Sequence, residues 1–569
     1  MKLNGAEILI ECLIEQGVDT VFGYPGGAIL NVYDALYKNK DRIKHVLTSH
    51  EQGASHAADG YSRSTGKTGV VIATSGPGAT NLVTGIATAY MDSIPMVAIT
   101  CNVPTSLLGK DSFQEVDISG ITMPVTKHSY IIKRGESIAD AIREAFVVAN
   151  TGRPGPVLID LPKDVTAQMF EYEKYTPSKA PKAEFIHKHG GVLRLTEDMH
   201  TSDEDAQTAA DLINKSKQPI IYAGGGIVAS GAYAEVLALA EKANIPVCVS
   251  LMAKSAFPAN HRLCTGMVGM HGSKASNVGI NQADLIITLG ARFSDRVISD
   301  PAKFAKKSKI LQIDIDQAEI NKNVSAHFSI VSDLKEALQK VVPLVEEASH
   351  EDWTAKIVEL KTHIPSMYNK KVAIHPKTVC EYIAEKLGDD AIIVTEVGQH
   401  QMWTAQFYPF TRPRSFLTSG GLGTMGFGTG AAMGAQIANP DKRVVHIAGD
   451  GSFRMNCNEL STVEHYNIPM ITIVANNGTL GMVRQWQNLF YGKRFSETTL
   501  DRGPDFLKLA DAYGIDGYRA TTEDEFKKAF DSAVAKNQPA LIEAFIDIDE
   551  MVLPMVPAGK AIEETLLEV

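Results

Sequence analysis

Cysteine is scarce in this sequence, and long apolar runs are missing. The six cysteines lie scattered at positions 12, 101, 248, 264, 380 and 457, with no C-x-x-C spacing. This pattern excludes a disulfide framework and a cysteine-based zinc site, and it indicates a reducing compartment. No run of about 18 apolar residues occurs, so we expect no transmembrane helix. The N-terminus carries acids in an amphipathic helical pattern, unlike a signal peptide, and we therefore expect a cytoplasmic protein.

An excess of positive charge is also missing. The formal net charge is −11, which argues against a nucleic-acid-binding surface. Hydrophobic residues make up 44% of the chain and charged residues 21%, which is an ordinary balance for a globular protein. A length of 569 residues suggests about three or four domains.

Short apolar runs alternate with helical patterns along the chain. The runs that predict strands lie at 21–24, 46–48, 69–74, 96–100, 157–160, 219–223, 247–250, 285–289, 310–314, 391–394, 444–447, 471–474 and 540–545. Residues 172–189, rich in Lys, Pro and Ala, predict a linker, and a second polar stretch covers 346–366. Strands that alternate with helices predict mostly parallel sheets covered by helices. We therefore predict an α/β protein with domains at 1–170, 190–345 and 370–546 and a tail at 547–569.

Two polar turns in the last domain follow two predicted strands. Gly449-Asp450-Gly451 comes after the run 444–447, Asn476-Asn477 comes after the run 471–474, and a helical pattern lies between them. In a parallel sheet both turns lie at the carboxyl edge, where α/β proteins bind ligands. A carboxylate at Asp450 and an amide oxygen at Asn477 suit Mg²⁺, and Gly451 lets backbone approach closely. The unit can therefore hold a metal-bound diphosphate, although ordinary β-α-β units also use Asp and Asn in turns.

Two glycine-rich stretches are weaker signals. Residues 60–68 (GYSRSTGKT) are similar to a phosphate-binding P-loop, but five residues separate the glycines and the strand follows the loop. The motif needs four residues and a preceding strand, so we reject this interpretation. Residues 421–426 (GLGTMG) match the letters of a nicotinamide-binding loop without a clear preceding strand, which is poor evidence for such a site.

Glu51 directly follows a predicted strand and begins a helical pattern. Its position suits an ordinary acid at a helix start, which the helix dipole favours. It equally suits a buried acid that exchanges a proton with a cofactor ring. The residues around Glu51 leave both interpretations open.

A resemblance that covers nearly the whole chain favours the second interpretation. It rests on the GDG and NN turns and on 24–28 (YPGGA), 50–53 (HEQG), 74–81 (TSGPGATN), 92–95 (DSIP), 397–403 (VGQHQMW), 420–428 (GGLGTMGFG) and 480–487 (LGMVRQWQ). Together these stretches resemble the thiamine-diphosphate enzymes, and among them the catalytic large subunits of the acetohydroxyacid (acetolactate) synthases. The resemblance implies a cofactor held between two chains, and hence a homodimer or homotetramer. One chain would grip the pyrimidine with its N-terminal domain, and the other would grip the diphosphate with its C-terminal domain.

The same resemblance implies roles for individual residues. Glu51 would share a proton with the pyrimidine ring, and Met425 would support the bent cofactor. The implied thiamine-diphosphate contacts are Glu51, Gln399, His400, Gly423, Met425, Asp450, Gly451, Ser452, Asn477 and Met482. The implied Mg²⁺ ligands are Asp450, Asn477 and the carbonyl of Thr479, a position where the family often has His.

The central domain resembles the FAD-binding form of this family. Glycine turns and arginines suit the phosphates of a dinucleotide, and acids suit its ribose hydroxyls. The implied FAD contacts are Arg153, Gly224, Gly225, Gly226, Leu251, Met252, Gly269, Met270, His271, Gly290, Arg292, Arg296, Asp314, Ile315 and Asp333. In this family the flavin has no redox role in the overall reaction.

The implied reaction is decarboxylation of pyruvate and transfer of the hydroxyethyl group to a second 2-oxo acid. Pyruvate as acceptor gives 2-acetolactate, and 2-oxobutyrate gives 2-aceto-2-hydroxybutyrate, in branched-chain amino acid biosynthesis. The implied catalytic residues are Glu51, Gly27, Gln114 and Lys163. The implied substrate-channel residues are Ala28, Pro104, Phe113 and Trp486, of which Trp486 would favour 2-oxobutyrate as acceptor.

Two alternatives remain at this point. One is a pyruvate oxidase-like enzyme, or another thiamine-diphosphate 2-oxoacid decarboxylase, on the same fold. The other is a non-catalytic protein with this fold, and the joint presence of Glu51, Asp450 and Asn477 argues against it. Because no regulatory domain is evident in the chain, we expect any feedback control to come from a separate small subunit. We also expect residues 551–559 to fold over the site when the cofactor binds.

Overall fold

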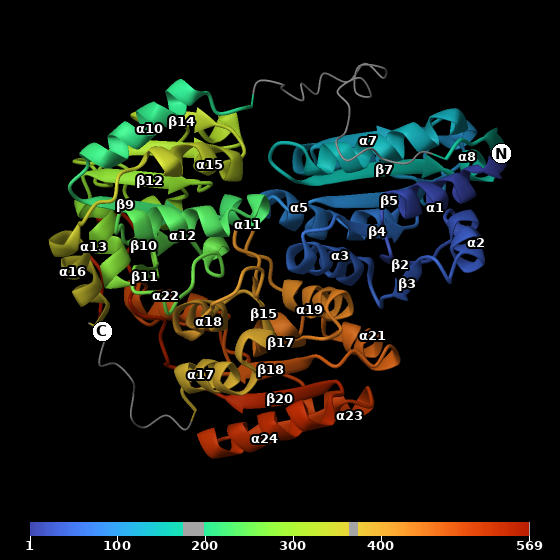
Figure 1. The fold of residues 1–569 in the computed structure, drawn as a ribbon. Coiled ribbons are helices and arrows are strands. Elements are labelled where there is room, and N and C mark those ends of the chain that lie inside the picture. Colours follow the sequence, from blue (N-terminus) through green and yellow to red (C-terminus); the bar gives the residue numbers. More distant parts are fainter. Residues whose placement is uncertain (175–198, 363–373, 568–569) are drawn as a thin grey trace.

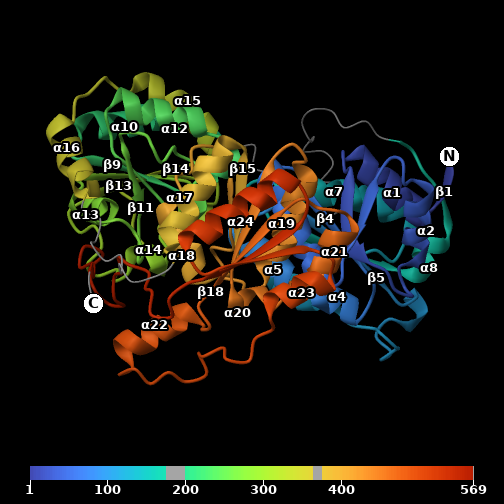
Figure 2. The same ribbon diagram turned by 90° about the horizontal axis from the view of Figure 1, so that it is seen from below.

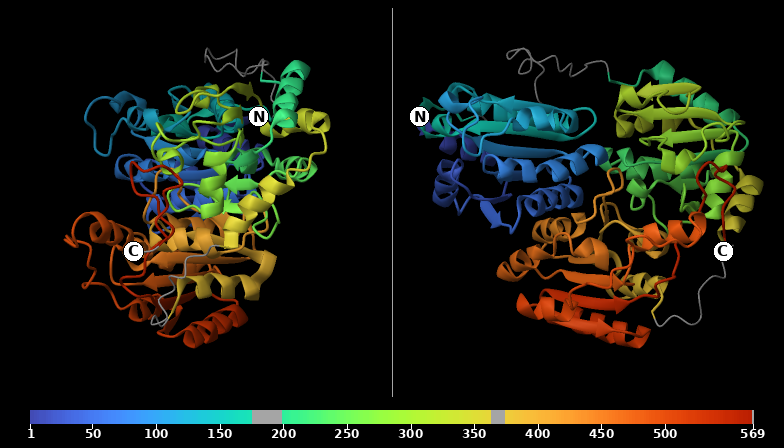
Figure 3. Two further views of the ribbon diagram at one scale, coloured as in Figure 1. Left: turned by 90° about the vertical axis from the view of Figure 1, so that its left-hand side faces the viewer. Right: turned by 180° about the vertical axis from the view of Figure 1, so that it is seen from behind.

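The computed structural model describes residues 1–174, 199–362 and 374–567, and most of the predicted 172–189 linker lies outside them. Three six-stranded parallel sheets dominate this part of the chain, and helices cover each sheet on both faces (Figures 1 and 3). The α/β prediction is confirmed. Among the described residues, no helix combines the length and apolar character needed to cross a membrane.

The N-terminal sheet has the order β3-β2-β4-β5-β7-β6. Its strands are β2 (Thr20–Tyr24), β3 (Lys44–Leu47), β4 (Gly69–Ala73), β5 (Met96–Asn102), β6 (His128–Ile131) and β7 (Pro156–Pro162). One face packs against α1 (Gly5–Glu15), α2 (Leu30–Lys38) and α7 (Ile138–Asn150), and the other against α3 (Glu51–Thr65) and α5 (Val83–Asp92). The shorter helices are α4 (Pro77–Asn81), α6 (Ile118–Thr122) and α8 (Lys163–Ala167). A small antiparallel pair joins β1 (Lys2–Asn4) to β8 (Met169–Glu171).

The C-terminal sheet repeats the same topology, in the order β16-β15-β17-β18-β20-β19. Its strands are β15 (Ala391–Thr395), β16 (Phe416–Leu417), β17 (Arg443–Gly449), β18 (Ile471–Asn476), β19 (Asp516–Ala520) and β20 (Ala540–Phe545). One face packs against α17 (Pro376–Leu387), α18 (Gln399–Phe407) and α24 (Glu523–Lys536), and the other against α19 (Phe427–Ala438), α21 (Leu460–His465) and α23 (Phe506–Ala512). The remaining helices are α20 (Asp450–Phe453) and α22 (Gly481–Phe490).

The central sheet has a different order, β11-β10-β9-β12-β13-β14. Its strands are β9 (Pro219–Ala223), β10 (Val247–Val249), β11 (Cys264–Met267), β12 (Leu285–Leu289), β13 (Lys309–Asp314) and β14 (Phe328–Val331). The helices around it are α10 (Asp203–Lys215), α11 (Gly226–Ser230), α12 (Tyr233–Lys242), α13 (Lys274–Gln282), α14 (Asp295–Ile298), α15 (Leu334–Leu344) and α16 (Glu351–Glu359). This strand order is that of dinucleotide-binding folds, which bind their ligand at the carboxyl ends of the strands.

Helices α3 and α19 hold the N-terminal and C-terminal sheets together (Figure 1). A Cβ on Gly60 would lie 2.0 Å from the carbonyl oxygen of Ala431, and one on Gly434 would lie 1.8 Å from that of Ala57. Glycine is therefore needed where the two backbones touch. One apolar cluster runs across this contact, so the two sheets share a core.

Several edge strands have no counterpart in the sequence-based prediction, namely β6, β11, β14, β16 and β19. Strand β16 precedes the GLGTMG stretch, which begins four residues after Leu417, so this stretch does lie between a short strand and a helix. The rejected P-loop stretch is different, because Gly60–Thr65 belongs to helix α3. The polar stretch at 346–366 contains helix α16 in its described part.

Candidate active site

One large cavity of about 1540 Å³ is lined mainly by loops of the central and C-terminal sheets, and residues of the N-terminal domain such as Arg63, Asp92 and Arg153 complete its wall. On its C-terminal side, the lining residues follow strands β15, β16, β17 and β18. They include Gln399, His400, Gly423, Met425, Asp450, Gly451, Ser452, Asn477, Thr479 and Met482. The diphosphate and Mg²⁺ residues predicted in this domain therefore lie together. Ligand pockets usually measure about 300–1,000 Å³, so this cavity has room for more than one ligand.

Asp450 is the most unusual side chain of the cavity. It is 1% exposed, and neither carboxylate oxygen has a hydrogen-bond partner among the described residues. Its nearest cationic group is Arg454, whose guanidinium nitrogen lies 3.7 Å away. Burial raises the pKa of Asp450 to about 6. A buried carboxylate without hydrogen bonds is costly, and a bound cation would compensate its charge.

Two further residues of the cavity could supply oxygen ligands to a metal bound at this carboxylate. The Asn477 side-chain amide donates to Gln399 Oε1 at 3.1 Å, and Asn477 Oδ1 accepts from the Thr479 amide at 3.3 Å. The Thr479 hydroxyl donates to the carbonyl of Thr498 at 2.7 Å, so this side chain serves the loop itself. No cluster of three His, Cys, Asp or Glu side chains in the described ranges could bind a metal. One carboxylate, one amide and one carbonyl nevertheless fit Mg²⁺, which usually takes its other ligands from water and phosphate.

His400 suits the diphosphate that would accompany the metal. It is 6% exposed, and burial lowers its pKa to about 3, so the ring is neutral at physiological pH. Its Nε2 atom has no partner among the described residues, although it belongs to the cavity lining. A neutral imidazole can donate one hydrogen bond to a phosphate oxygen.

The raised pKa of Asp450 predicts a pH dependence of metal binding. Below about pH 6 the folded protein holds a proton on this carboxyl group, and a metal ion must displace it. We expect the affinity of the apoprotein for Mn²⁺, a spectroscopic substitute for Mg²⁺, to weaken by about tenfold per pH unit below 6 and to level off above it. The titration is done without cofactor, because a diphosphate also binds protons in this range. An affinity that stays constant below pH 6 would contradict the assignment.

The central-domain end of the cavity contains most of the predicted FAD contacts. The lining includes Arg153, Gly225, Gly226, Leu251, Met252, Met270, His271, Gly290, Arg292, Arg296, Asp314, Ile315 and Asp333. Gly224 and Gly269 lie just outside the lining and shape its turns. A Cβ on Gly224 would lie 2.1 Å from the carbonyl oxygen of Gly290, and Gly269 has a φ of +117°. Glycine loops at the carboxyl ends of this strand order fit a dinucleotide.

Charged groups line the same end. Asp314 is the last residue of β13 and is 9% exposed, and burial raises its pKa to about 6. Arg153 comes from the N-terminal domain and pairs with Glu319 at 2.9 Å and Asp316 at 3.2 Å. An acid at the end of this strand fits ribose hydroxyls, and a nearby guanidinium fits a phosphate.

Apart from Arg153, the predicted residues of the N-terminal domain lie elsewhere. Gly27, Ala28, Glu51, Pro104, Phe113, Gln114 and Lys163 follow strands β2, β3, β5 and β7, and none of them lines the large cavity. Trp486 is the one predicted channel residue that does. The fold therefore places the predicted pyrimidine and diphosphate residues of one chain in two separate regions. Phe113 is a large apolar side chain that is 88% exposed. Exposed apolar groups of this size often mark a surface that another molecule covers.

Glu51 is the first residue of α3 and is 9% exposed. Its Oε2 atom accepts a hydrogen bond from the Asn81 amide at 2.9 Å, and a Cβ on Gly78 would lie 3.1 Å from Oε1. The glutamate is thus packed against the 74–81 stretch.

Glu459 of the C-terminal domain, which the sequence does not single out, contacts the turn that precedes Glu51. Its fully buried carboxylate accepts from the amides of Ser49 and His50 at 3.0 and 2.9 Å.

The C-terminal segment runs from the C-terminal domain back to the central domain (Figure 2), where it contacts residues that line the cavity. The Trp403 indole donates to the carbonyl of Met551 at 3.2 Å, and the Val556 amide donates to that of Met270 at 2.8 Å. Gln485, buried and also unforeseen from the sequence, exchanges two hydrogen bonds of 2.8 and 3.0 Å with the Val552 backbone. The segment therefore ties the C-terminal domain to the central domain beside the site.

Comparisons with known proteins agree with this arrangement. Descriptions of thiamine pyrophosphate (thiamine diphosphate) enzymes match three parts of the chain: the N-terminal TPP-binding domain at 3–121, the central domain at 206–341 and the C-terminal TPP-binding domain at 396–544. A probable acetolactate synthase large subunit of Methanocaldococcus jannaschii is 48% identical over 98% of this chain and 94% of the relative. An acetolactate synthase large subunit of Lactococcus lactis is 44% identical over 99% of this chain and 96% of the relative. An acetolactate synthase of Mycobacterium bovis is 44% identical over 99% and 91%. The chain therefore belongs to the thiamine pyrophosphate enzymes and, among them, to the family of the acetolactate synthase large subunits.

Proposed function

We propose that this chain decarboxylates pyruvate and transfers the two-carbon unit to a second 2-oxo acid, forming 2-acetolactate or 2-aceto-2-hydroxybutyrate. The observation that carries the proposal is the buried carboxylate of Asp450, which has no hydrogen-bond partner among the described residues and lies beside Asn477 and Thr479 in a large cavity. This donor set fits the Mg²⁺ of a metal-bound diphosphate. When bound, thiamine diphosphate would supply the electron sink that decarboxylation of a 2-oxo acid needs.

Different residues of the chain would hold the metal and the cofactor, move the proton and orient the substrate. Asp450, Asn477 and the Thr479 carbonyl would hold Mg²⁺, and His400 would donate to the diphosphate. Met425 would support the cofactor from the loop before α19. Glu51 would hold and move a proton at the pyrimidine ring. Gly27, Gln114 and Lys163 would orient the substrate in the channel that includes Ala28, Pro104 and Phe113.

We further propose that a second copy of the chain completes each site. The separation of Glu51 from the cavity that Asp450 lines supports this arrangement.

FAD would occupy the central-domain end of the cavity, next to Asp314 and the glycine loops. The domain boundaries predicted above, a homodimeric or homotetrameric assembly and a cytoplasmic location also belong to the proposal. Several relatives are named as large subunits, which supports a separate small regulatory subunit for this chain as well.

The test is product analysis of the purified protein with pyruvate, Mg²⁺ and thiamine diphosphate, with and without FAD. We expect 2-acetolactate that requires FAD, with no net bleaching of the flavin. Bleaching by pyruvate without acetolactate would instead indicate a pyruvate oxidase. Acetolactate without FAD would contradict the flavin assignment, and no turnover at all would favour a non-catalytic protein.

Trp486 is proposed to select the acceptor. It lines the cavity, and its ring packs edge-on against Phe490 with the centroids 5.8 Å apart. One additional methylene in an apolar pocket is worth about 1–3 kcal/mol, so we expect Trp486→Leu to lower the preference for 2-oxobutyrate by about tenfold. The measurement is the ratio of the two products in competition. Leu489→Ala is the matched control, because Leu489 lies on the same helix outside the lining. An equal change in both variants would contradict a direct role.

A further inference from the structure

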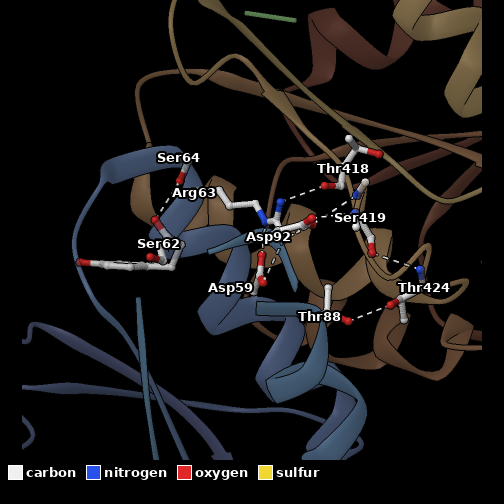
Figure 4. A network of polar contacts seen from close by, with 12 residues as sticks. Asp59, Ser62, Arg63, Ser64, Thr88, Asp92, Thr418, Ser419 and Thr424 are labelled. Atoms are coloured by element: carbon white, nitrogen blue, oxygen red, sulfur yellow. Dashed lines mark hydrogen bonds and ion pairs between the residues drawn. The ribbon is translucent and has the colours of Figure 1, made fainter. Parts of the chain in front are cut away.

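The loop at 418–426, between β16 and α19, forms part of the cavity wall. Its lining residues are Ser419, Gly420, Gly421, Gly423 and Met425. Arg63 and Asp92 of the N-terminal domain contact this loop, and both also line the cavity (Figure 4). The loop therefore belongs to the C-terminal domain, but a different domain of the same chain determines its position.

Asp92 makes the central contact. Its carboxylate is 0% exposed and accepts hydrogen bonds from the amides of Gly421 at 2.7 Å and Gly420 at 3.2 Å (Figure 4). Asp92 is also the last residue of α5, where a negative charge opposes the helix dipole. Helix stability therefore does not explain an acid at this position, whereas the two loop amides do.

Arg63 joins this contact to a buried charge cluster. It donates to Asp92 Oδ2 at 2.9 Å, pairs with Asp59 on the same helix, and donates to the carbonyl of Thr418 at 2.9 Å (Figure 4). The side chains of Arg63 and Asp59 are 5% and 0% exposed. Two acids and one arginine leave a net negative charge in the interior. Amide donors of the loop help to compensate it, as buried charges require.

The loop has little space to move. A Cβ on Gly421 would lie 2.6 Å from Asp92 Oδ1, and one on Gly420 would lie 2.4 Å from the sulfur of Met252. Glycine at both positions lets the loop fit between the N-terminal domain and a predicted flavin contact. On the same loop, the Thr424 hydroxyl lies 2.7 Å from that of Thr88. All three domains thus contact the loop that carries Met425.

We propose that Asp92 is a positioning residue of this enzyme. Through Gly420 and Gly421, its carboxylate fixes the loop that presents Gly423 and Met425 to the cofactor. The inference rests on the proposed function of the cavity, since it assigns the loop a role in holding thiamine diphosphate. It adds a residue that acts on the cofactor-binding loop across a domain boundary.

The experiment compares Asp92→Asn with Asp59→Asn. Both variants remove one negative charge and one partner of Arg63 from the same cluster, but only Asp92 contacts the loop. An asparagine at 92 has one acceptor oxygen, so its amide group would face a loop N–H or Arg63. We expect hydrogen exchange of the 418–426 amides in the apoprotein to be at least about tenfold faster in Asp92→Asn and nearly unchanged in Asp59→Asn. The thiamine-diphosphate concentration for half-saturation, measured by binding calorimetry, is expected to rise about tenfold in Asp92→Asn alone.

A second variant covers the case in which Asp92→Asn does not fold. Gly421→Ala leaves every charge in place and pushes the loop away from Asp92, so it is expected to reproduce the faster exchange and weaker cofactor binding. Equal effects of the two Asp→Asn variants would overturn the proposal and indicate a general role in stability. Faster exchange without weaker cofactor binding would also overturn it. Failure of the wild type to form acetolactate would instead count against the proposed function, and the exchange and calorimetry results would still decide the role of Asp92.

Discussion

Replacing Glu51 with glutamine is expected to slow acetolactate formation by roughly 10²–10⁴-fold, the usual contribution of a positioned acid–base group. The substitution keeps the side-chain oxygen that accepts from Asn81 at 2.9 Å, so the local structure can persist. What it removes is the exchangeable proton of the carboxyl group. The measurement is the rate of acetolactate formation at saturating pyruvate, Mg²⁺ and thiamine diphosphate.

The control for this variant is Glu464→Gln, because Glu464 is exposed and lies outside the cavity lining. It is expected to keep the wild-type rate. Binding of thiamine diphosphate to Glu51→Gln, measured by calorimetry, separates loss of chemistry from loss of cofactor. A rate within a few-fold of the wild type would show that Glu51 is an ordinary acid at a helix start.

Replacing Asp450 with asparagine is expected to weaken Mg²⁺-dependent cofactor binding by on the order of 10²-fold or more, since it removes the one carboxylate of the proposed metal site. The same change should not harm the fold. Burial raises the pKa of Asp450 to about 6, so at neutral pH the ionised folded form is disfavoured relative to the unfolded chain. We therefore expect the apoprotein of the variant to be more stable than the wild type by about 1–3 kcal/mol.

Thermal unfolding of the two apoproteins tests this second expectation. Because the folded-state pKa is raised, the wild type loses stability as the pH rises from about 4 to about 6, and the variant lacks this contribution. Asp441→Asn, at an exposed position after α19, is the matched control and is expected to change neither stability nor metal binding. A variant that is less stable than the wild type would mean that the Asp450 carboxylate has a structural partner.

Mixing the two inactive variants tests how the site is assembled. If each site combines Glu51 of one chain with Asp450 of another, a mixed dimer contains one intact site and one doubly defective site. Random association should then restore about a quarter of the wild-type activity, because half of the dimers are mixed. No recovery after co-expression, with mixed dimers verified, would place both residues of a site in the same chain.

The sequence by itself determined the class of fold and the inner strands. Runs such as 285–289 and 471–474 lie inside parallel sheets, where both faces of a strand are buried and all but one position of each run is apolar. The edge strands were different. Strand β19 (Asp516–Ala520) has the sequence DGYRA, in which exposed positions alternate with more buried ones, and β16 has only two residues. Such strands carry no apolar run, and they become visible only when a neighbouring strand supplies the hydrogen bonds.

For the candidate site, too, the sequence predicted some features and only the structure showed the others. Asp450 and Asn477 could be placed near each other from the sequence, because the carboxyl ends of adjacent parallel strands meet at one edge, and β17 does pair with β18. The sequence could not show that Glu51 lies away from the cavity, nor that Glu459 and Asp92 act across a domain boundary. Their partners lie hundreds of positions away, as with Asp92 and Gly421. The positions of strands follow from local periodicity, whereas contacts between domains depend on how whole surfaces fit, and only the tertiary structure decides that.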